Sequence, residues 1–149
     1  MMADRRDALA SAAEVVLAVE GAARASGAVD TVGTVGQLAV FPGAVNGVPS
    51  RVDLSVDVRD IDGSRRDATV GAILASMNEV AARRGVRVDI STVSDDPPAT
   101  MDAGLIDVLD AAANDAGVAT HRLPSRAYHD SLFMPRACPT AMLFVPCRD

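Results

Sequence analysis

The chain has 149 residues, and hydrophobic residues make up 49% of them, which is enough for a packed core and argues against disorder. The net charge is −6, and all 14 basic residues are arginines dispersed among Asp and Glu, so binding to nucleic acid is disfavoured. The apolar runs are too short to cross a bilayer and the N-terminus lacks the apolar stretch of a secretory signal, so we expect a cytoplasmic protein without a membrane partner.

Apolar periodicity predicts five elements in the first part of the chain. In chain order they are a helix over 4–25, strands over 31–41 and 51–60, a helix over 65–84 and a strand over 86–93. Asp4 is the expected N-cap of the first helix, and Gly85 is expected to end the second. This order predicts an α+β fold, a two-layer sandwich of an antiparallel sheet and two helices. It matches a ferredoxin-like βαββαβ arrangement that lacks its first strand.

The character of the sequence changes at the acidic and proline-rich stretch 94–99, which is typical of a linker. We therefore predict two domains, residues 1–94 and residues 95–149. In the second, the expected elements are a helix over 101–116, a short helix over 127–134 and a buried strand over 139–146.

Two polar residues of the first domain could hold an acid. Asn46 lies in the loop before the strand 51–60, and Arg59 lies near the end of that strand on its polar face. Arginine suits a carboxylate because it can donate two parallel N–H bonds, and asparagine adds a donor and an acceptor. The alternative is that Asn46 is a turn residue and that Arg59 pairs with Asp57 or Asp60 on a solvated face.

The second domain carries a His129–Asp130 pair that could orient an imidazole for metal or proton chemistry, although a lone histidine is more often structural. A zinc site is disfavoured because the candidate ligands are too far apart in the sequence. They are His121, His129, Cys138 and Cys147.

Several stretches, taken in order, resemble the N-carbamoyl-L-amino-acid hydrolase, allantoate amidohydrolase and ureidopropionase family of aminoacylase-like dinuclear metallohydrolases. The lid or dimerisation domain of that family is matched by residues 5–9, 31–36, 42–49 and 57–59, and its return to the catalytic domain by residues 123–130 and 137–146. Residues 95–149 would then form part of an α/β catalytic domain.

The resemblance implies roles for particular residues. Asn46 and Arg59 occupy positions that grip the substrate carboxylate, and His129 lies near the metal site. Tyr128, with Arg126, stands where the family has glycines that let the backbone approach the substrate, so Tyr128 is expected to contact the substrate or alter specificity. The implied substrate is a small ureido or carbamoyl acid, and the lid is expected to pair with a second copy as a homodimer.

The family holds two divalent metals, Zn or Mn, with His, Asp and Glu ligands, and those ligands are not among the matched residues. We therefore expect no metal site in this chain, which would be an incomplete piece of an amidohydrolase without turnover of its own. The alternatives are a dimerisation or binding module without chemistry, or an inactive remnant.

Overall fold

A computed structural model describes residues 1–146 of the chain. The chain divides into two compact units, Met1–Asp95 and Asp96–Asp149. Among the described residues, no helix is both long enough and apolar enough to cross a bilayer.

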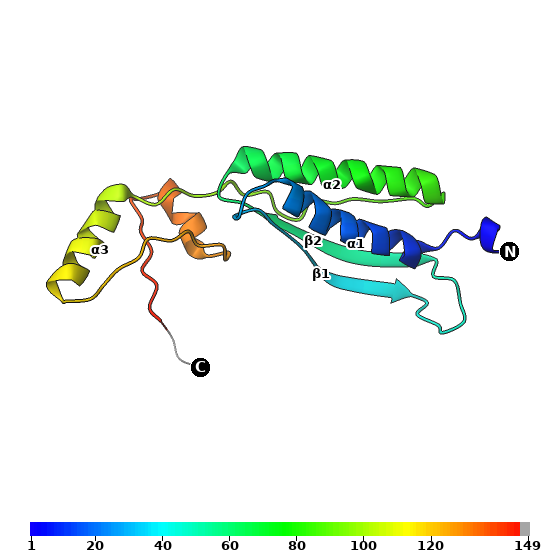
Figure 1. Cartoon of the computed structure of the whole chain (residues 1–149), viewed down its shortest axis with the longest axis horizontal. Helices are drawn as coiled ribbons and strands as arrows, with labels where there is room; N and C mark the ends of the chain where they lie inside the picture. The colour runs from blue at the N-terminus through cyan, green and yellow to red at the C-terminus, as the bar shows by residue number, and fades with distance from the viewer. Residues whose placement is uncertain (147–149) are drawn as a thin grey trace. The chain divides into compact units, whose positions relative to one another are not determined.

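The first unit consists of two helices packed on one face of a β-hairpin (Figure 1). A short 3-10 helix, η1 (Met2–Asp4), precedes helix α1 (Ala8–Ala25); strands β1 (Val32–Phe41) and β2 (Arg51–Arg59) follow, and then helix α2 (Gly63–Arg84). This arrangement confirms the predicted α+β fold of antiparallel strands and two helices.

The strands pair antiparallel, from Val32 opposite Arg59 to Phe41 opposite Arg51, with one irregularity between Val35 and Gln37. Every second side chain of β2 is partly buried, as its alternating sequence predicts.

The core lies between the helices and the inner face of the hairpin. It contains Val15 and Val19 of α1 with three residues of α2, and partly buried strand residues pack against it. The α2 residues are Ile73, Met77 and Val80. At the surface, Glu14 of α1 accepts hydrogen bonds from Arg83 and Arg84 of α2, which lower the pKa of its carboxyl group to about 2. The helices are therefore joined by apolar packing and by one ion cluster.

The first helix begins three residues later than the predicted N-cap implies. Asp7 is the N-cap, because its carboxylate accepts hydrogen bonds from the backbone N–H groups of Leu9 and Ala10, both at 3.0 Å. Asp4 lies at the end of η1 and pairs with the terminal amine of Met1. Both aspartates are plausible caps by residue type, and the structure selects the second.

The predicted strand 86–93 does not form. Residues 86–93 belong to no assigned element, and residues 87–93 make no backbone–backbone hydrogen bond to any described residue. In a βαββαβ arrangement the last strand pairs with the first, and the part of the chain described here contains no first strand. The alternation of residues 86–93 predicts a strand, but a ladder also needs a neighbouring strand.

The second unit has little internal packing. It contains helix α3 (Ala103–Asp115) and the 3-10 helices η2 (Asp130–Leu132) and η3 (Met134–Arg136), the latter two in place of the short helix predicted over 127–134. No side chain between 96 and 146 is buried, and the predicted strand 139–146 is absent, with Leu143 67% exposed. An apolar sequence predicts burial only where other elements exist to cover it, and here residues 140–142 are only partly buried and residues 143–146 are exposed.

Two glycines, one inside α2 and one that caps its C-terminus, should respond oppositely to alanine. Gly85 ends the helix at φ +62, so Gly85→Ala should lower the free energy of unfolding by about 1 kcal/mol. Gly71 lies inside the helix with open space around it, so Gly71→Ala should raise the free energy of unfolding by about 0.5–1 kcal/mol. Urea unfolding followed by circular dichroism measures both. Equal shifts of the same sign would contradict the assigned backbone conformations.

Candidate functional site

Asn46 stands at the exposed tip of the loop between β1 and β2. The Gly47 N–H donates to the Ala44 carbonyl at 3.3 Å, which closes a turn around Asn46. The end of the loop is fixed to the first helix, because the Ala8 N–H donates to the Pro49 carbonyl at 3.1 Å. The Asn46 amide is thus presented to solvent from a loop with an anchored base.

Arg59, the last residue of β2, already binds a carboxylate. Its Nε and one Nη donate to the two oxygens of Asp57, each at 2.7 Å, which is the bidentate geometry that arginine offers to acids. The hydrogen bonds from Arg59 lower the pKa of the Asp57 carboxyl group, and those to Asp57 raise the pKa of the guanidinium. Both side chains are about half exposed, so an incoming acid can reach this pair.

Asn46 and Arg59 do not meet within one chain. The loop that carries Asn46 joins the strands beside the Phe41–Arg51 pair, whereas Arg59 lies opposite Val32 at the other end of the hairpin. The eight residue steps from Arg51 to Arg59 span about 26 Å at the usual rise of a strand. A small acid cannot touch both side chains of one copy.

The end of β2 that presents Arg59 is fixed by the next residue, Asp60. Its side chain is fully buried, and its carboxylate accepts hydrogen bonds from the Thr31 hydroxyl, from Arg65 Nε at 2.7 Å and from the Asp62 N–H at 2.9 Å. These bonds, led by those from Arg65, hold the pKa of Asp60 well below its usual range. One carboxylate therefore joins the entry to β1, the exit from β2 and the first turn of α2.

In the second unit, the Tyr128 hydroxyl donates to an Asp96 carboxylate oxygen at 2.8 Å, and the ring packs edge-on against Phe133 at 5.8 Å between centroids. His129 is half-buried, with its Nε2 2.9 Å from the Ser125 hydroxyl and its ring 6.3 Å from that of Phe144. Tyr128 and His129 are thus held by neighbours in their own unit. Their predicted contacts with a substrate stay predictions.

The two units adjoin in the sequence at two neighbouring acids, each held within its own unit. Asp95 accepts from the Arg66 guanidinium at 2.7 Å. Asp96 accepts from Tyr128 and pairs with Arg136 at 3.6 Å.

The described residues do not provide a donor set for a divalent metal. Among residues 1–146, no group of three or more His, Cys, Asp or Glu side chains converges on one point. Of the ligands considered for zinc, Cys147 lies outside the described residues, and His129 is paired with a hydroxyl. Two metals with open positions need several such ligands. We therefore assign no metal-dependent step to these residues.

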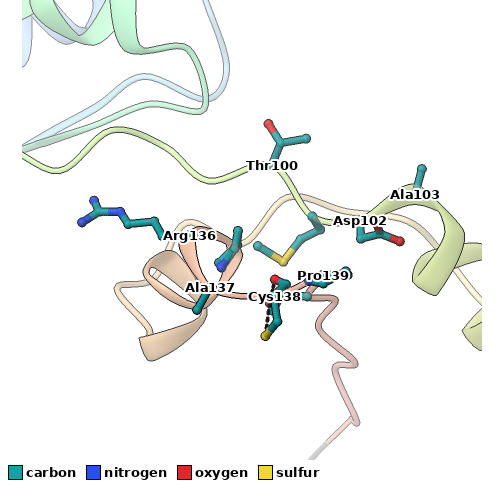
Figure 2. Close-up of a pocket in the computed structure, with 10 residues that line it drawn as sticks. Thr100, Asp102, Ala103, Arg136, Ala137, Cys138 and Pro139 are labelled. Carbon is teal, nitrogen blue, oxygen red and sulfur yellow. Dashed lines mark hydrogen bonds between the residues drawn. The ribbon is translucent and has the colours of Figure 1, made fainter.

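A hollow of the second unit has a volume of about 570 Å³ and lies between the start of α3 and the segment after η3 (Figure 2). Its polar groups do not converge on one point, since Arg136 and Asp102 lie on opposite sides of it. Asp102 caps α3 by accepting from the Leu105 N–H at 2.8 Å. The hollow therefore shows no arrangement of groups suited to a ligand.

Comparison with known proteins shows close relatives over the whole chain. Ureidoglycolate hydrolases of Oryza sativa subsp. japonica and Arabidopsis thaliana are 43% and 44% identical over 148 residues, covering 99% of this chain and 31% of each relative. An N-carbamoyl-L-amino acid amidohydrolase of Geobacillus stearothermophilus is 35% identical over 148 residues and is covered to 36%. The chain is therefore similar to one stretch of these amidohydrolases. It spans about a third of the length of these relatives.

Solved structures agree. The crystal structure of AtUAH in complex with (S)-hydroxyglycine matches 99% of this chain with a TM-score of 0.94 and 44% identity. An amidase of the hydantoinase/carbamoylase family from Burkholderia vietnamiensis matches all of it with a TM-score of 0.94 and 31% identity. The chain covers 35% and 36% of these two structures. No family model matches the sequence. The resemblance stated from the sequence is thereby confirmed at the level of the family.

The sequence offers Asp57 and Asp60 as alternative partners of Arg59, and the structure shows the pairing with Asp57. Nothing in the sequence indicates that Asp96 is the partner of Tyr128. An Arg two residues from an Asp on the same face of a strand is a signal for the first pair. The second pair joins residues 32 positions apart, and no local pattern predicts it.

Proposed function

We propose that the first unit, residues 1–95, is the substrate-anchoring and dimerisation lid of an amidohydrolase that cleaves carbamoyl or ureido C–N bonds in small acids. The observation that carries this proposal is the Arg59 guanidinium, which binds a carboxylate in bidentate geometry at an accessible strand end. A substrate carboxylate would bind the Arg59 guanidinium together with Asp57 or in place of Asp57. The names of the relatives support the substrate class, because they describe hydrolases of ureidoglycolate and of N-carbamoyl-L-amino acids.

We further propose that each carboxylate site is built from two copies of the chain, with Arg59 from one copy and Asn46 from the other. The support is geometric, since the two side chains stand at opposite ends of a hairpin about 26 Å long. A twofold dimer creates two equivalent composite sites, because each copy lends its loop tip to its partner and its strand end to its own site. In such a site Arg59 neutralises the acid and the Asn46 amide fixes its orientation.

Binding of N-carbamoylglycine to the intact chain, followed by NMR or calorimetry, tests the anchor. The wild type should bind this acid and not its carboxamide analogue, which lacks the negative charge. Arg59→Ala and Asn46→Ala should each weaken binding at least tenfold, because each removes one side of the grip. Arg122→Ala is the control, since Arg122 also pairs with aspartates, Asp107 and Asp110, but lies in the second unit.

An equimolar mixture of the two weakened variants tests the composite site. A mixed dimer would contain one site with both substitutions and one intact site. About one quarter of the wild-type binding sites should therefore return after the copies exchange. If no sites return although sedimentation shows mixed dimers, the composite site is wrong, and equal binding of the carboxamide would refute the anchoring role itself.

A further inference from the structure

The Arg59 anchor lies beside a carboxylate that belongs to the chain itself. Asp57 stands two residues before Arg59 on the same polar face of β2, so their α-carbons are about 6.6 Å apart at the usual rise of a strand. Its two carboxylate oxygens accept from Arg59 Nε and one Nη, each at 2.7 Å. Any acid that binds this guanidinium, together with Asp57 or in its place, therefore lies close to the negative charge of Asp57.

The two strands of the hairpin provide no second cation next to Arg59. The β1 residues opposite the Asp57–Arg59 pair are Val32 and Thr34, and neither carries a charge. The only other basic residue of the two strands is Arg51, which lies at the far end of β2 and pairs with an aspartate of its own. A second carboxylate on a ligand would thus meet Asp57 without a compensating positive charge from either strand.

The arginine that follows β2 is already matched by acids. The hydrogen bonds to Asp60 raise the pKa of the Arg65 guanidinium, and the charges of Asp62 and Asp30 raise it further. More than one carboxylate therefore acts on this single guanidinium. Arg65 accordingly does not supply positive charge for a second acid group of a ligand that is bound at Arg59.

We infer that Asp57 is a specificity-determining residue of the Arg59 anchor, which restricts the anchor to acids that carry one negative charge beside a neutral group. The inference rests on the proposed carboxylate site. The charge of a monoacid is matched by the guanidinium, and a carbamoyl or ureido N–H next to it can donate to Asp57. The second charge of a diacid has no such match and is repelled by Asp57.

Two ligands that differ by one charge measure this selectivity. N-carbamoyl-L-asparagine and N-carbamoyl-L-aspartate have side chains of nearly the same shape, but only the second is ionised there. In calorimetry at neutral pH, the intact chain should bind the asparagine derivative about fivefold more tightly than the aspartate derivative. Asp57→Asn should bind the two about equally, because the repelling charge is gone. Asp57→Glu, which keeps the charge, should retain the preference.

Asp107→Asn is the matched control, because Asp107 is also an exposed aspartate paired with an arginine but lies in the second unit. It should leave the preference unchanged. A preference that persists in Asp57→Asn or is absent from the wild type would overturn the inference, as would no binding of either ligand.

The Arg59→Ala variant separates this inference from the anchor on which it rests. If Arg59→Ala binds the asparagine derivative as tightly as the wild type does, the proposed anchor fails and the specificity role fails with it. If that binding is lost while Asp57→Asn keeps the preference, only the specificity role of Asp57 fails.

Discussion

Replacing Asp60 by asparagine is expected to lower the free energy of unfolding by about 3 kcal/mol. The carboxylate is fully buried and holds three segments together through Thr31, Arg65 and the Asp62 N–H. The asparagine side chain keeps one acceptor oxygen, but its NH2 group is itself a donor and would face the donors of Arg65. The Arg65 guanidinium would also lose its negatively charged partner. Urea unfolding at neutral pH, followed by circular dichroism, measures the loss.

Asp57→Asn is the matched control, because this aspartate also pairs with an arginine but is about half exposed. It should cost less than about 1 kcal/mol, since exposed ion pairs contribute little. Similar losses of unfolding free energy for the two variants would show that burial is not what makes the hydrogen bonds of Asp60 stabilising.

Asp60 also makes stability depend on pH. Its folded-state pKa lies well below that of the unfolded chain, so its contribution is complete above the unfolded value of about 4 and is lost as the pH falls from there toward the folded value. The gap in stability between the wild type and Asp60→Asn should therefore shrink between about pH 4 and pH 2. A gap that stays constant over that range would contradict the assigned charge state.

Ile73→Ala should lower the free energy of unfolding by about 3 kcal/mol. Ile73 is 2% exposed and packs in the cluster formed by both helices, so truncation removes buried methyl groups and leaves a cavity. Leu17→Ala is the control, because Leu17 lies on α1 but is 66% exposed and should change stability by less than about 0.5 kcal/mol. A loss below about 1 kcal/mol for Ile73→Ala would mean that the helices do not pack as described.

The elements that the sequence predicted well are those set by local periodicity. The alternation from Arg51 to Arg59 defines β2, and the helical period that ends at Gly85 defines α2. The errors occur where a distant residue decides the outcome. The N-cap lies at Asp7 beside a backbone bond from Ala8 to a loop more than forty residues away, which no local signal reveals.

In the candidate site, too, local sequence predicts some features, and distant residues decide the others. Residue type and the alternation of β2 predict Arg59 on an accessible polar face, and the structure pairs it there with Asp57, the alternative partner that the sequence offered. The separation of Asn46 from Arg59 depends on the register of the hairpin, which fixes the ends at which they lie. The burial of Asp60 depends on three segments meeting, so its importance cannot be read from the acid-rich turn in which it stands.

The two neighbouring acids at the junction of the units are each charge-paired within their own unit. Asp95 pairs with Arg66 in the first unit, and Asp96 accepts from Tyr128 and pairs with Arg136 in the second. Each ion pair has one well-exposed side chain, so added salt weakens both pairs by screening.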